Sequence, residues 1–593
     1  SEEDDVKVYK ATAENIVENN FDSAEELAYQ KDDAVAYMSD RDGDIKFSVT
    51  VDEDSVFLWY YDQENDEWIE FYQYSKKQDT FEPIGTLANG KLAVLSNEVT
   101  DKTSLLEFDL YSKEYGDVLF EHQNYDLVTA TVNEVGRLDK VSYFDHGEFK
   151  TEYFDSDERV FSDILNKKLP EQQHIIISTS DHYSTAITFS SNNPGAYYLI
   201  DKESALVSEI YPLYEEFPTH DLVKSQTFTL KNRSGETIEI IYTPALQKHS
   251  MNTLLVVPHG GPVGERDYNV YNQSNQFYAN RGYSVLNVNF SGSSGFGKNH
   301  IDKGKAQFGK KIEQDITDAV EFIQSKYSFE NICSMGASYG GYSALMLTIY
   351  HPKTYDCAVS SFGIYDIPML FNSNNYSLTE EHRSAVEAVV GKESDELKKY
   401  SPVYMAEKIN VPILLIAGTD DQIASVEHSN RMKYVLKKKN KKIEHLFYHK
   451  TGHGHAQWYG DRHEAILVDD FLRRTLSLPK LKRAKNDNSF RDEVMFLADS
   501  FAFNDVVGND VSKALDYYRI AADERHPRAW FNLAAHYHRG DGVSKNLNTA
   551  IKYYKKSSDL GYTNGSYRVF ELYSRGDDIE SNEALAHEYL LKA

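Results

Sequence analysis

The stretch Gly336-Ala337-Ser338-Tyr339-Gly340-Gly341 lies between two apolar segments, and it decides the fold of the middle of the chain. Residues 332–335 before it have the apolar character of a buried strand, and an apolar helix is expected from about Tyr342. Glycines two residues before and two residues after a serine form a sharp strand-to-helix turn that raises the serine side chain above a sheet. The pattern in this context predicts that Ser338 is an exposed nucleophile.

Around this stretch, residues 222–480 alternate between apolar strands and amphipathic helices. Further strands are expected at residues 254–257, 283–288, 357–360, 413–417 and 444–448. One of the helices has its apolar side chains on a single face, at Ile312, Ile316, Ala319, Val320, Ile323 and Tyr327. Alternation of this kind predicts a parallel sheet covered by helices on both faces. With the turn at Ser338, it predicts an α/β-hydrolase domain over residues 222–480.

A serine hydroxyl is a weak nucleophile at neutral pH, so it needs a general base and a group that orients this base. On a fold with this turn, the three groups follow the chain order Ser, Asp or Glu, His. The last two predicted strands are followed by Asp420-Asp421 and by a loop that holds His453 and His455. The pattern alone leaves open which aspartate and which histidine act. A metal site at His453 and His455 is not expected, because no supporting cysteine or ligand cluster lies near this loop.

The oxyanion that develops during acyl transfer needs fixed donors, commonly two backbone N–H groups. Tyr339 directly follows the nucleophile and supplies one of them. The second donor is expected from the loop His259-Gly260-Gly261-Pro262, which follows the early strand at 254–257. Glycines in this loop let the backbone approach a substrate closely. A plain turn is the alternative interpretation of this loop.

The region before residue 222 has a different pattern. From about Val35 to Tyr211, short alternating strands are separated by turn signals such as Asn89-Gly90, and no helix-period segment is visible. Regular hairpins with aromatic strands predict propeller blades, and at ~40–45 residues per blade the region holds four or five. We therefore expect an all-β domain over residues 1–221, as a partial or degenerate β-propeller. A sandwich or a barrel is the alternative.

Residues 480–488 have the composition of a charged linker, and the pattern after them is helical. Ala514-Leu515-Asp516-Tyr517-Tyr518 recurs 36 positions later as Ala550-Ile551-Lys552-Tyr553-Tyr554. Paired helices at this period form a solenoid, because each pair buries its apolar face against the next. The repeated residues resemble the Sel1 repeats, relatives of the tetratricopeptide repeat. We expect Sel1-like helical repeats over residues 489–593, where a protein partner or a second subunit would bind.

The composition limits the classes of partner. The formal charge is −30, from 93 acidic against 63 basic residues. A field of this sign repels nucleic acid and anionic membranes, so neither is expected as a partner. No apolar run reaches the length of a membrane span. Two cysteines, Cys333 and Cys357, are too few for a disulfide framework or a zinc site, and we expect them to be small buried apolar side chains.

Three motifs together resemble the prolyl oligopeptidase family of serine peptidases, especially its acylaminoacyl-peptidase-like branch. They are the stretch around Ser338, the loop at 259–262 and the segment Asn289-Phe290-Ser291-Gly292-Ser293-Ser294-Gly295-Phe296-Gly297. The resemblance extends over about residues 228–478. Ser291 departs from the family, which commonly has Arg there. Family members carry a seven- or eight-bladed propeller, and the β region of this chain is too short for that number of blades.

The family pattern also selects among the candidate residues. Aligned without gaps, residues 418–429 place the acid at Asp421, and the family's Gly-His-Gly pattern places the base at His453. The second oxyanion donor is then the N–H group of Gly261. The resemblance therefore implies a catalytic triad of Ser338, Asp421 and His453, with no cofactor and no metal.

The function expected from these residues is a serine peptidase that hydrolyses short peptides through an acyl-enzyme, of oligopeptidase, acylaminoacyl-peptidase or aminopeptidase type. A carboxylesterase or another acyl hydrolase on the same fold is the alternative, because the same three groups cleave esters. A third hypothesis is an interaction scaffold, in which the repeats are the functional part and the hydrolase is vestigial. The intact serine, acid and histidine argue against this third hypothesis.

Overall fold

The structure is a computed structural model of the 593-residue chain. It describes residues 9–10, 25–26, 31–39, 45–52, 55–75, 80–133, 135–214, 221–372, 379–479, 489–576 and 579–593. The predicted charged linker at 480–488 lies outside the described residues. The chain forms two compact units, described here one at a time. The first consists of Ser1–Thr219, Arg266–Tyr271 and Ser291–Gly304, and the second of His220–Glu265, Asn272–Phe290 and Lys305–Ala593.

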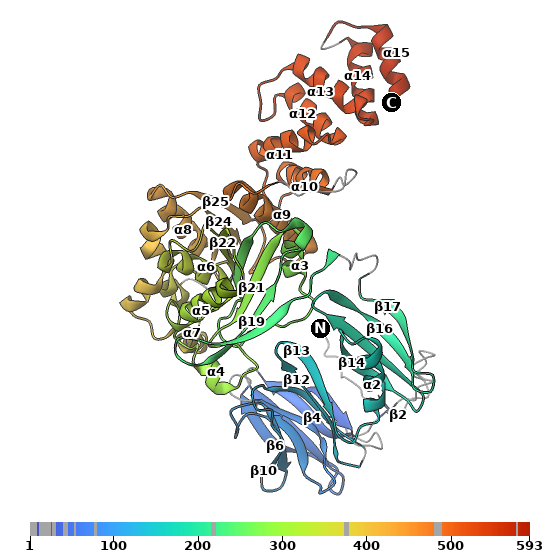
Figure 1. Cartoon of the computed structure of the whole chain (residues 1–593), viewed down its shortest axis with the longest axis vertical. Coiled ribbons are helices and arrows are strands. Elements are labelled where there is room, and N and C mark those ends of the chain that lie inside the picture. The colour runs from blue at the N-terminus through green and yellow to red at the C-terminus, as the bar shows by residue number, and fades with distance from the viewer. Residues whose placement is uncertain are drawn as a thin grey trace. The chain divides into compact units, whose positions relative to one another are not determined.

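The first unit is built from antiparallel sheets whose strands pair in chain order (Figure 1). Two short strands, β1 (Tyr9–Lys10) and β2 (Glu25–Glu26), pair with each other. The first four-stranded sheet contains β3 (Ala34–Ser39), β4 (Ile45–Asp52), β5 (Ser55–Asp62) and β6 (Glu67–Ser75). The second contains β7 (Phe81–Thr86), β8 (Leu92–Ser96), β9 (Ser104–Asp109) and β10 (Glu114–Phe120).

Two more sheets follow in the same unit. The third sheet has β11 (Leu127–Val132), β12 (Leu138–Asp145) and β13 (Glu148–Tyr153), and the fourth has β14 (Gln173–Thr179), β15 (Tyr183–Ser190), β16 (Asn193–Asp201) and β17 (Leu206–Pro212). Apolar side chains pack between the first and second sheets, around Phe71 and Phe108, and between the second and third, around Leu105 and Val141. Successive meander sheets with a core between them confirm the predicted all-β domain.

One helix interrupts this region, where none was expected. Helix α2 (Glu158–Lys168) joins β13 to β14 and buries Phe161 and Leu165 against Ile176 and Ile200 of the fourth sheet. Its apolar residues Val160, Phe161, Ile164 and Leu165 have helical spacing, so the signal was present in the sequence and was missed because it extends over only 11 residues.

The second unit contains an eight-stranded sheet in the order β18-β19-β21-β20-β22-β23-β24-β25. The pairs β18·β19 and β19·β21 are antiparallel, and the remaining pairs are parallel. The strands are β18 (Gln226–Lys231), β19 (Thr237–Thr243), β20 (Thr253–Pro258), β21 (Tyr283–Asn289), β22 (Asn331–Ala337), β23 (Cys357–Ser361), β24 (Ile413–Gly418) and β25 (Ile443–Tyr448). The predicted parallel sheet is present, and an antiparallel hairpin of β18 and β19 precedes it in the chain.

Helices cover both faces of this sheet. One face packs against α5 (Lys311–Lys326), α6 (Tyr339–Tyr350) and α8 (Val426–Lys438), and the other against α3 (Gln273–Asn280) and α9 (Trp458–Thr475). Two further α-helices lie in this part of the chain, α4 (Lys298–Asp302), which belongs to the first unit, and α7 (Glu380–Val390). Short 3-10 helices occur at Gln247–His249, Ile367–Phe371, Asp395–Tyr400 and Pro402–Lys408. Alternate residues of the buried strands point to opposite faces, which is why the two cores share no strand residue. The α/β-hydrolase prediction is confirmed.

The C-terminal part is helical, as predicted. It consists of α10 (Ser489–Phe503), α11 (Val511–Asp523), α12 (Pro527–Arg539), α13 (Leu547–Asp559), α14 (Thr563–Arg575) and α15 (Glu583–Lys592) (Figure 1). Helices α12 and α14 both end at a glycine in the left-handed conformation, Gly540 and Gly576, which stops a helix without steric strain. These two glycines lie 36 residues apart, so the sequence repeat is also a structural repeat.

Helices α10 and α11 share a hydrophobic core with the sheet of the same unit. Val494 and Leu515 belong to the cluster that contains Leu414 of β24 and Leu467 of α9. Salt bridges reinforce this contact, since Arg281 binds both Asp469 of α9, at 3.1 Å, and Glu493 of α10, at 2.7 Å. The boundaries 1–221, 222–480 and 489–593 remain predictions, and in the structure the repeats group with the hydrolase sheet in one compact unit.

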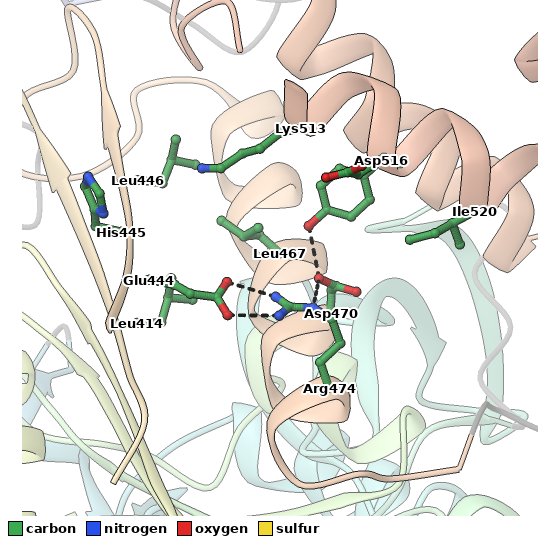
Figure 2. A pocket seen from close by; sticks show the side chains of 11 residues that line it. Leu414, Glu444, His445, Leu446, Leu467, Asp470, Arg474, Lys513, Asp516 and Ile520 are labelled. Atoms are coloured by element: carbon green, nitrogen blue, oxygen red, sulfur yellow. Dashed lines mark hydrogen bonds and ion pairs between the residues drawn. The ribbon is translucent and has the colours of Figure 1, made fainter. Parts of the chain in front are cut away.

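Figure 2 shows where α11 meets β25 and α9. Arg474 makes two hydrogen bonds of 2.9 Å to the carboxylate of Glu444 and one of 2.8 Å to Asp470. The hydroxyl of Tyr517 on α11 donates to the same oxygen of Asp470, at 3.0 Å. These groups line a cavity of about 390 Å³ with apolar side chains of the shared core. Hydrogen bonds between polar side chains therefore connect helix α11 to helix α9, and helix α9 to strand β25, beside this cavity.

The two cysteines correct the sequence interpretation. Both are fully buried, as expected, but Cys333 and Cys357 form a disulfide with an S–S distance of 2.02 Å. They are direct register partners on the parallel strands β22 and β23, with Cα atoms 4.8 Å apart. The sequence could not show this pairing because it depends on the register of two strands separated by a helix.

None of the described helices combines the length and the apolar composition that a membrane span requires.

Replacing both cysteines, Cys333→Ala with Cys357→Ala, is expected to lower the free energy of unfolding by about 3 kcal/mol. The disulfide closes a loop with a sequence separation of 24, and losing it restores conformational freedom to the unfolded chain. Chemical denaturation of the variant and of the oxidised wild type measures the difference. Equal stability of the two proteins, or two free thiols in the unreduced wild type by mass spectrometry, would contradict the prediction.

Candidate active site

Ser338 lies at the turn between β22 and α6, at the carboxyl end of a central strand of the sheet. Its φ is +56° and its ψ is −122°, a conformation that non-glycine residues rarely adopt. The backbone N–H group of Ser338 donates to the carbonyl of Ser361, the last residue of the neighbouring strand β23, at 3.0 Å. Strain of this kind persists only where the surrounding structure enforces it. The neighbouring strand and the following helix hold Ser338 in place.

The glycines of the motif are required by close backbone approach. A Cβ atom on Gly336 would lie 2.5 Å from the carbonyl carbon of Gly340. A Cβ atom on Gly340 would lie 2.2 Å from the carbonyl oxygen of Pro258, at the end of strand β20. Neither distance is possible for a real side chain, so both positions need glycine. The sharp turn and the tight packing of α6 on β20 explain the spacing seen in the sequence.

Asp421 and His453 are hydrogen-bonded to each other, with Oδ2 of the aspartate 2.8 Å from Nδ1 of the histidine. Asp421 follows β24 and is only 5% exposed. Its other oxygen, Oδ1, accepts from the backbone N–H groups of Ile423, at 2.9 Å, and Ala424, at 2.8 Å. Two backbone donors therefore fix the carboxylate, and its remaining oxygen is directed at the imidazole.

The neighbouring candidates have other partners. The carboxylate of Asp420 is exposed and lies 2.8 Å from the hydroxyl of its neighbour Thr419. His455 is paired through Nε2 with Glu464 of α9, at 2.8 Å. Of the two aspartates and the two histidines left open by the pattern, the structure thus brings together Asp421 and His453. No hydrogen bond joins these described side chains to Ser338 Oγ, and contacts of this kind often tighten only when substrate binds.

The loop after β20 lies beside Ser338. A Cβ atom on Gly260 would lie 3.7 Å from Cβ of Ser338, and Gly261 has a φ of +105°, a region that favours glycine. The ring of His259 stacks on Phe290 with 4.2 Å between ring centroids, which anchors the start of the loop. Burial lowers the pKa of His259 to about 4, so this ring is neutral at pH 7. The loop can therefore present backbone donors without adding a charge.

Tyr339, whose N–H is the other expected donor, is anchored by a buried carboxyl that the sequence did not single out. Its hydroxyl donates to Oε1 of Glu313 on α5, at 2.6 Å. Both side chains are buried, and within the described part of the chain Oε2 of Glu313 has no hydrogen-bond partner. Burial raises the pKa of Glu313 to about 7, mainly because the charged form loses its hydration. Apart from its place among the apolar positions of a helix, Glu313 gives no sequence signal.

Gly340→Ala is expected to destabilise the protein by about 3 kcal/mol or more, because the new methyl group overlaps the carbonyl oxygen of Pro258. Gly452→Ala is the matched control, since a Cβ atom at Gly452 meets no atom within 4 Å. We expect the control to change stability by less than about 0.5 kcal/mol. Melting temperatures of the two variants test the difference, and equal melting temperatures would contradict the proposed close packing.

Glu313→Gln is expected to gain stability relative to the wild type as the pH rises. The pKa of Glu313 is raised in the folded state, so the wild type loses stability between the unfolded pKa near 4.5 and the folded pKa of about 7. Between pH 5 and pH 8 this loss amounts to about 2–3 kcal/mol. Denaturation of both proteins at the two pH values measures it. A stability difference that does not change with pH would show that Glu313 titrates normally.

Comparison with protein families locates two kinds of domain. Residues 269–478 match the prolyl oligopeptidase family, Peptidase_S9. Residues 503–526, 527–562 and 564–593 match the Sel1 repeat. Together these matches cover the segment that contains Ser338, Asp421 and His453, and most of the helical region.

Two curated relatives illustrate the similarity. Dipeptidyl peptidase family member 6 of Caenorhabditis elegans is 25% identical over 449 residues, which are 70% of this chain and 60% of the relative. The acylamino-acid-releasing enzyme of Sus scrofa is 27% identical over 211 residues, 34% of this chain and 28% of the relative. The chain thus spans less than two thirds of the length of these relatives.

Among solved structures, a puromycin-hydrolyzing peptidase of Mycobacterium tuberculosis matches with a TM-score of 0.59 at 17% identity. The match covers 77% of this chain and 72% of that one. An acylaminoacyl peptidase of Pyrococcus horikoshii matches with a TM-score of 0.51 at 17% identity, over 78% of this chain and 84% of that one. At this identity the likeness supports the fold alone. The predicted resemblance is confirmed by the family matches: residues 269–478 are similar to the prolyl oligopeptidase family, and the Sel1 repeat matches follow from residue 503.

Proposed function

We propose that this chain is a serine peptidase that hydrolyses short peptides, with Ser338 as nucleophile, His453 as general base and Asp421 as the group that orients the base. The observation that carries the proposal is the 2.8 Å hydrogen bond between Asp421 and Nδ1 of His453. It holds the tautomer in which Nδ1 carries the proton, so Nε2 is left to accept the proton of the Ser338 hydroxyl. The family match over residues 269–478 supports the same reaction class.

The reaction proceeds in two halves. Ser338 Oγ attacks the scissile carbonyl carbon while its proton passes to Nε2 of His453. The carbonyl oxygen becomes an oxyanion, which accepts hydrogen bonds from the N–H groups of Gly261 and Tyr339. Collapse breaks the C–N bond, and the imidazolium returns its proton to the leaving amine, leaving an acyl-enzyme. A water molecule, deprotonated by His453, then releases the acid and regenerates the hydroxyl.

The substrate class follows from the relatives and the fold. The relatives are named as a dipeptidyl peptidase family member and an acylamino-acid-releasing enzyme, and one similar solved structure is a puromycin-hydrolyzing peptidase. We propose short peptides and aminoacyl amides as the substrates of this chain. The Sel1 repeats support a protein partner, because solenoids present extended binding surfaces.

Ser338→Ala is expected to abolish both turnover of aminoacyl, dipeptidyl and acylaminoacyl chromogenic amides and labelling by a fluorophosphonate probe. Asp421→Asn is expected to lower kcat by about 10⁴-fold, because the wrong histidine tautomer is then stabilised. Steady-state kinetics on the full chain measures both variants. Asp420→Asn is the matched control, since the exposed carboxylate of Asp420 has no contact with the imidazole in the described structure.

Three results would overturn the proposal in different ways. Ester turnover without amide turnover would assign a carboxylesterase, because only amide cleavage demands strong protonation of the leaving group. A wild-type chain that does not react with the probe would favour the interaction scaffold. Equal loss of activity in Asp420→Asn and Asp421→Asn would remove the role given to Asp421.

A further inference from the structure

A second acid–histidine pair includes a residue of the same loop as the proposed base. His455, two residues after His453 on the same loop, holds Oε2 of Glu464 through its Nε2, at 2.8 Å. The side chain of His455 is 5% exposed and that of Glu464 is 19% exposed, so the pair is largely shielded from water. Glu464 comes from α9, whereas the loop follows β25. The pair therefore fastens the histidine loop to a helix of the same compact unit.

The other oxygen of the same carboxylate reaches the strand beside the nucleophile. The hydroxyl of Ser361 donates to Oε1 of Glu464, at 2.6 Å. Ser361 is the residue whose carbonyl accepts from the N–H group of Ser338, at 3.0 Å. One carboxylate thus has a hydrogen bond on each oxygen, one toward the residue that holds Ser338 and one toward the loop that holds His453.

Aromatic rings pack around the hydrogen-bonded chain that joins Ser361, Glu464 and His455. Phe362, next to Ser361, packs edge-on against both rings, with centroids 6.2 Å from His453 and 5.7 Å from His455. The ring of Tyr448 is nearly perpendicular to that of His455, at 87°, with 4.4 Å between centroids. A Cβ atom on Gly460 would lie 2.3 Å from Nδ1 of His455, so α9 accommodates this ring only because that position is glycine. The ring of His455 has little freedom to move.

We infer that Glu464 and His455 are positioning residues, which hold the loop of His453 and the turn of Ser338 in a fixed mutual position. The inference rests on the proposed function of Ser338 and His453. Proton transfer between them needs a separation of about 2.6–3.2 Å, and a displacement of about 1 Å can cost 10²-fold in rate. A carboxylate with a hydrogen bond on each oxygen limits such a displacement, because moving either element breaks a bond that is shielded from water.

If Glu464 had a purely structural role, its removal would lower the amount of folded protein. Under the positioning role the fold is retained, because helix α9 is already held by buried apolar side chains, among them Ile466, Leu467 and Phe471. Removing the Glu464 carboxylate leaves these contacts in place, so the fold is expected to survive. The effect of the change is then a loss of rate rather than a loss of folded protein.

The test compares Glu464→Ala, Glu464→Gln and Asp461→Asn in the full chain. Asp461 is an exposed acid on the same helix whose side chain makes no hydrogen bond or ion pair within the described structure, so it is the control for lost charge. The Ala variant is expected to lose about 10- to 100-fold in kcat and in the rate of fluorophosphonate labelling, with KM within a factor of about two. Glutamine keeps an oxygen for Ser361 and offers an N–H group to His455, so it is expected to recover most of the rate.

Ser361→Ala extends the test, because it removes the hydroxyl and keeps the carbonyl that holds Ser338. It is expected to lower the labelling rate, and combining it with Glu464→Ala is expected to add little further loss, since both act through one link. If Glu464→Ala fails to fold, Glu464→Gln and Ser361→Ala provide the measurement.

Wild-type labelling rates in all these variants, with Ser338→Ala unreactive, would overturn the inference and leave the proposed function standing. Equal losses in Asp461→Asn and Glu464→Ala, or a loss in the Gln variant as large as in the Ala variant, would also overturn it. A wild-type chain that does not react with the probe would overturn the proposed function, and this inference with it.

Discussion

The close approach of Gly340 to strand β20 is the constraint on which the proposed site depends. The backbone of α6 lies so near the carbonyl of Pro258 that a Cβ atom at Gly340 would be 2.2 Å from that oxygen. This contact sets the first turn of α6 directly against the end of β20, and the chain can enter α6 only through the strained φ of Ser338. The strain is sustained by backbone packing on one side and by the hydrogen bond to Ser361 on the other. The exposed position of the serine is thus a consequence of how tightly its helix packs.

The strand order of the sheet places the other candidate residues near the turn at Ser338. Strand β22 lies between β20 and β23, and β24 and β25 follow in parallel. Because parallel strands end at one edge of a sheet, the loops that carry Gly261, Asp421 and His453 open on the same side as Ser338. The side chain of Asp421 can then be fixed by the N–H groups of its own loop, and its hydrogen bond to His453 joins two adjacent strand ends.

The residues that could be predicted from the sequence are those whose position is set by local pattern. The turn at Ser338, the candidate acids and the candidate histidines each follow a strand within a few residues, so spacing locates them. Glu313, Glu464 and the partner of Cys333 could not be found in this way. The position of each is set by the packing of a helix, or by the register of a strand, against a segment that is distant in the sequence. Ser361 and Glu464, for example, are 103 residues apart. Helix α2 was missed for a different reason, because its apolar periodicity is limited to 11 residues within a region of strand patterns.

Helix α9 connects the proposed catalytic loops to the repeats. Glu464 near its start binds the loop of His453 and the residue that holds Ser338. Further along, Asp469 binds Arg281, which also binds Glu493 of α10. The apolar side chains of α9 belong to the same core as those of α10 and α11. One helix therefore carries both the carboxylate that binds the loop of His453 and the side chains that bind α10, which makes α9 the structural connection between the proposed site and the C-terminal helices.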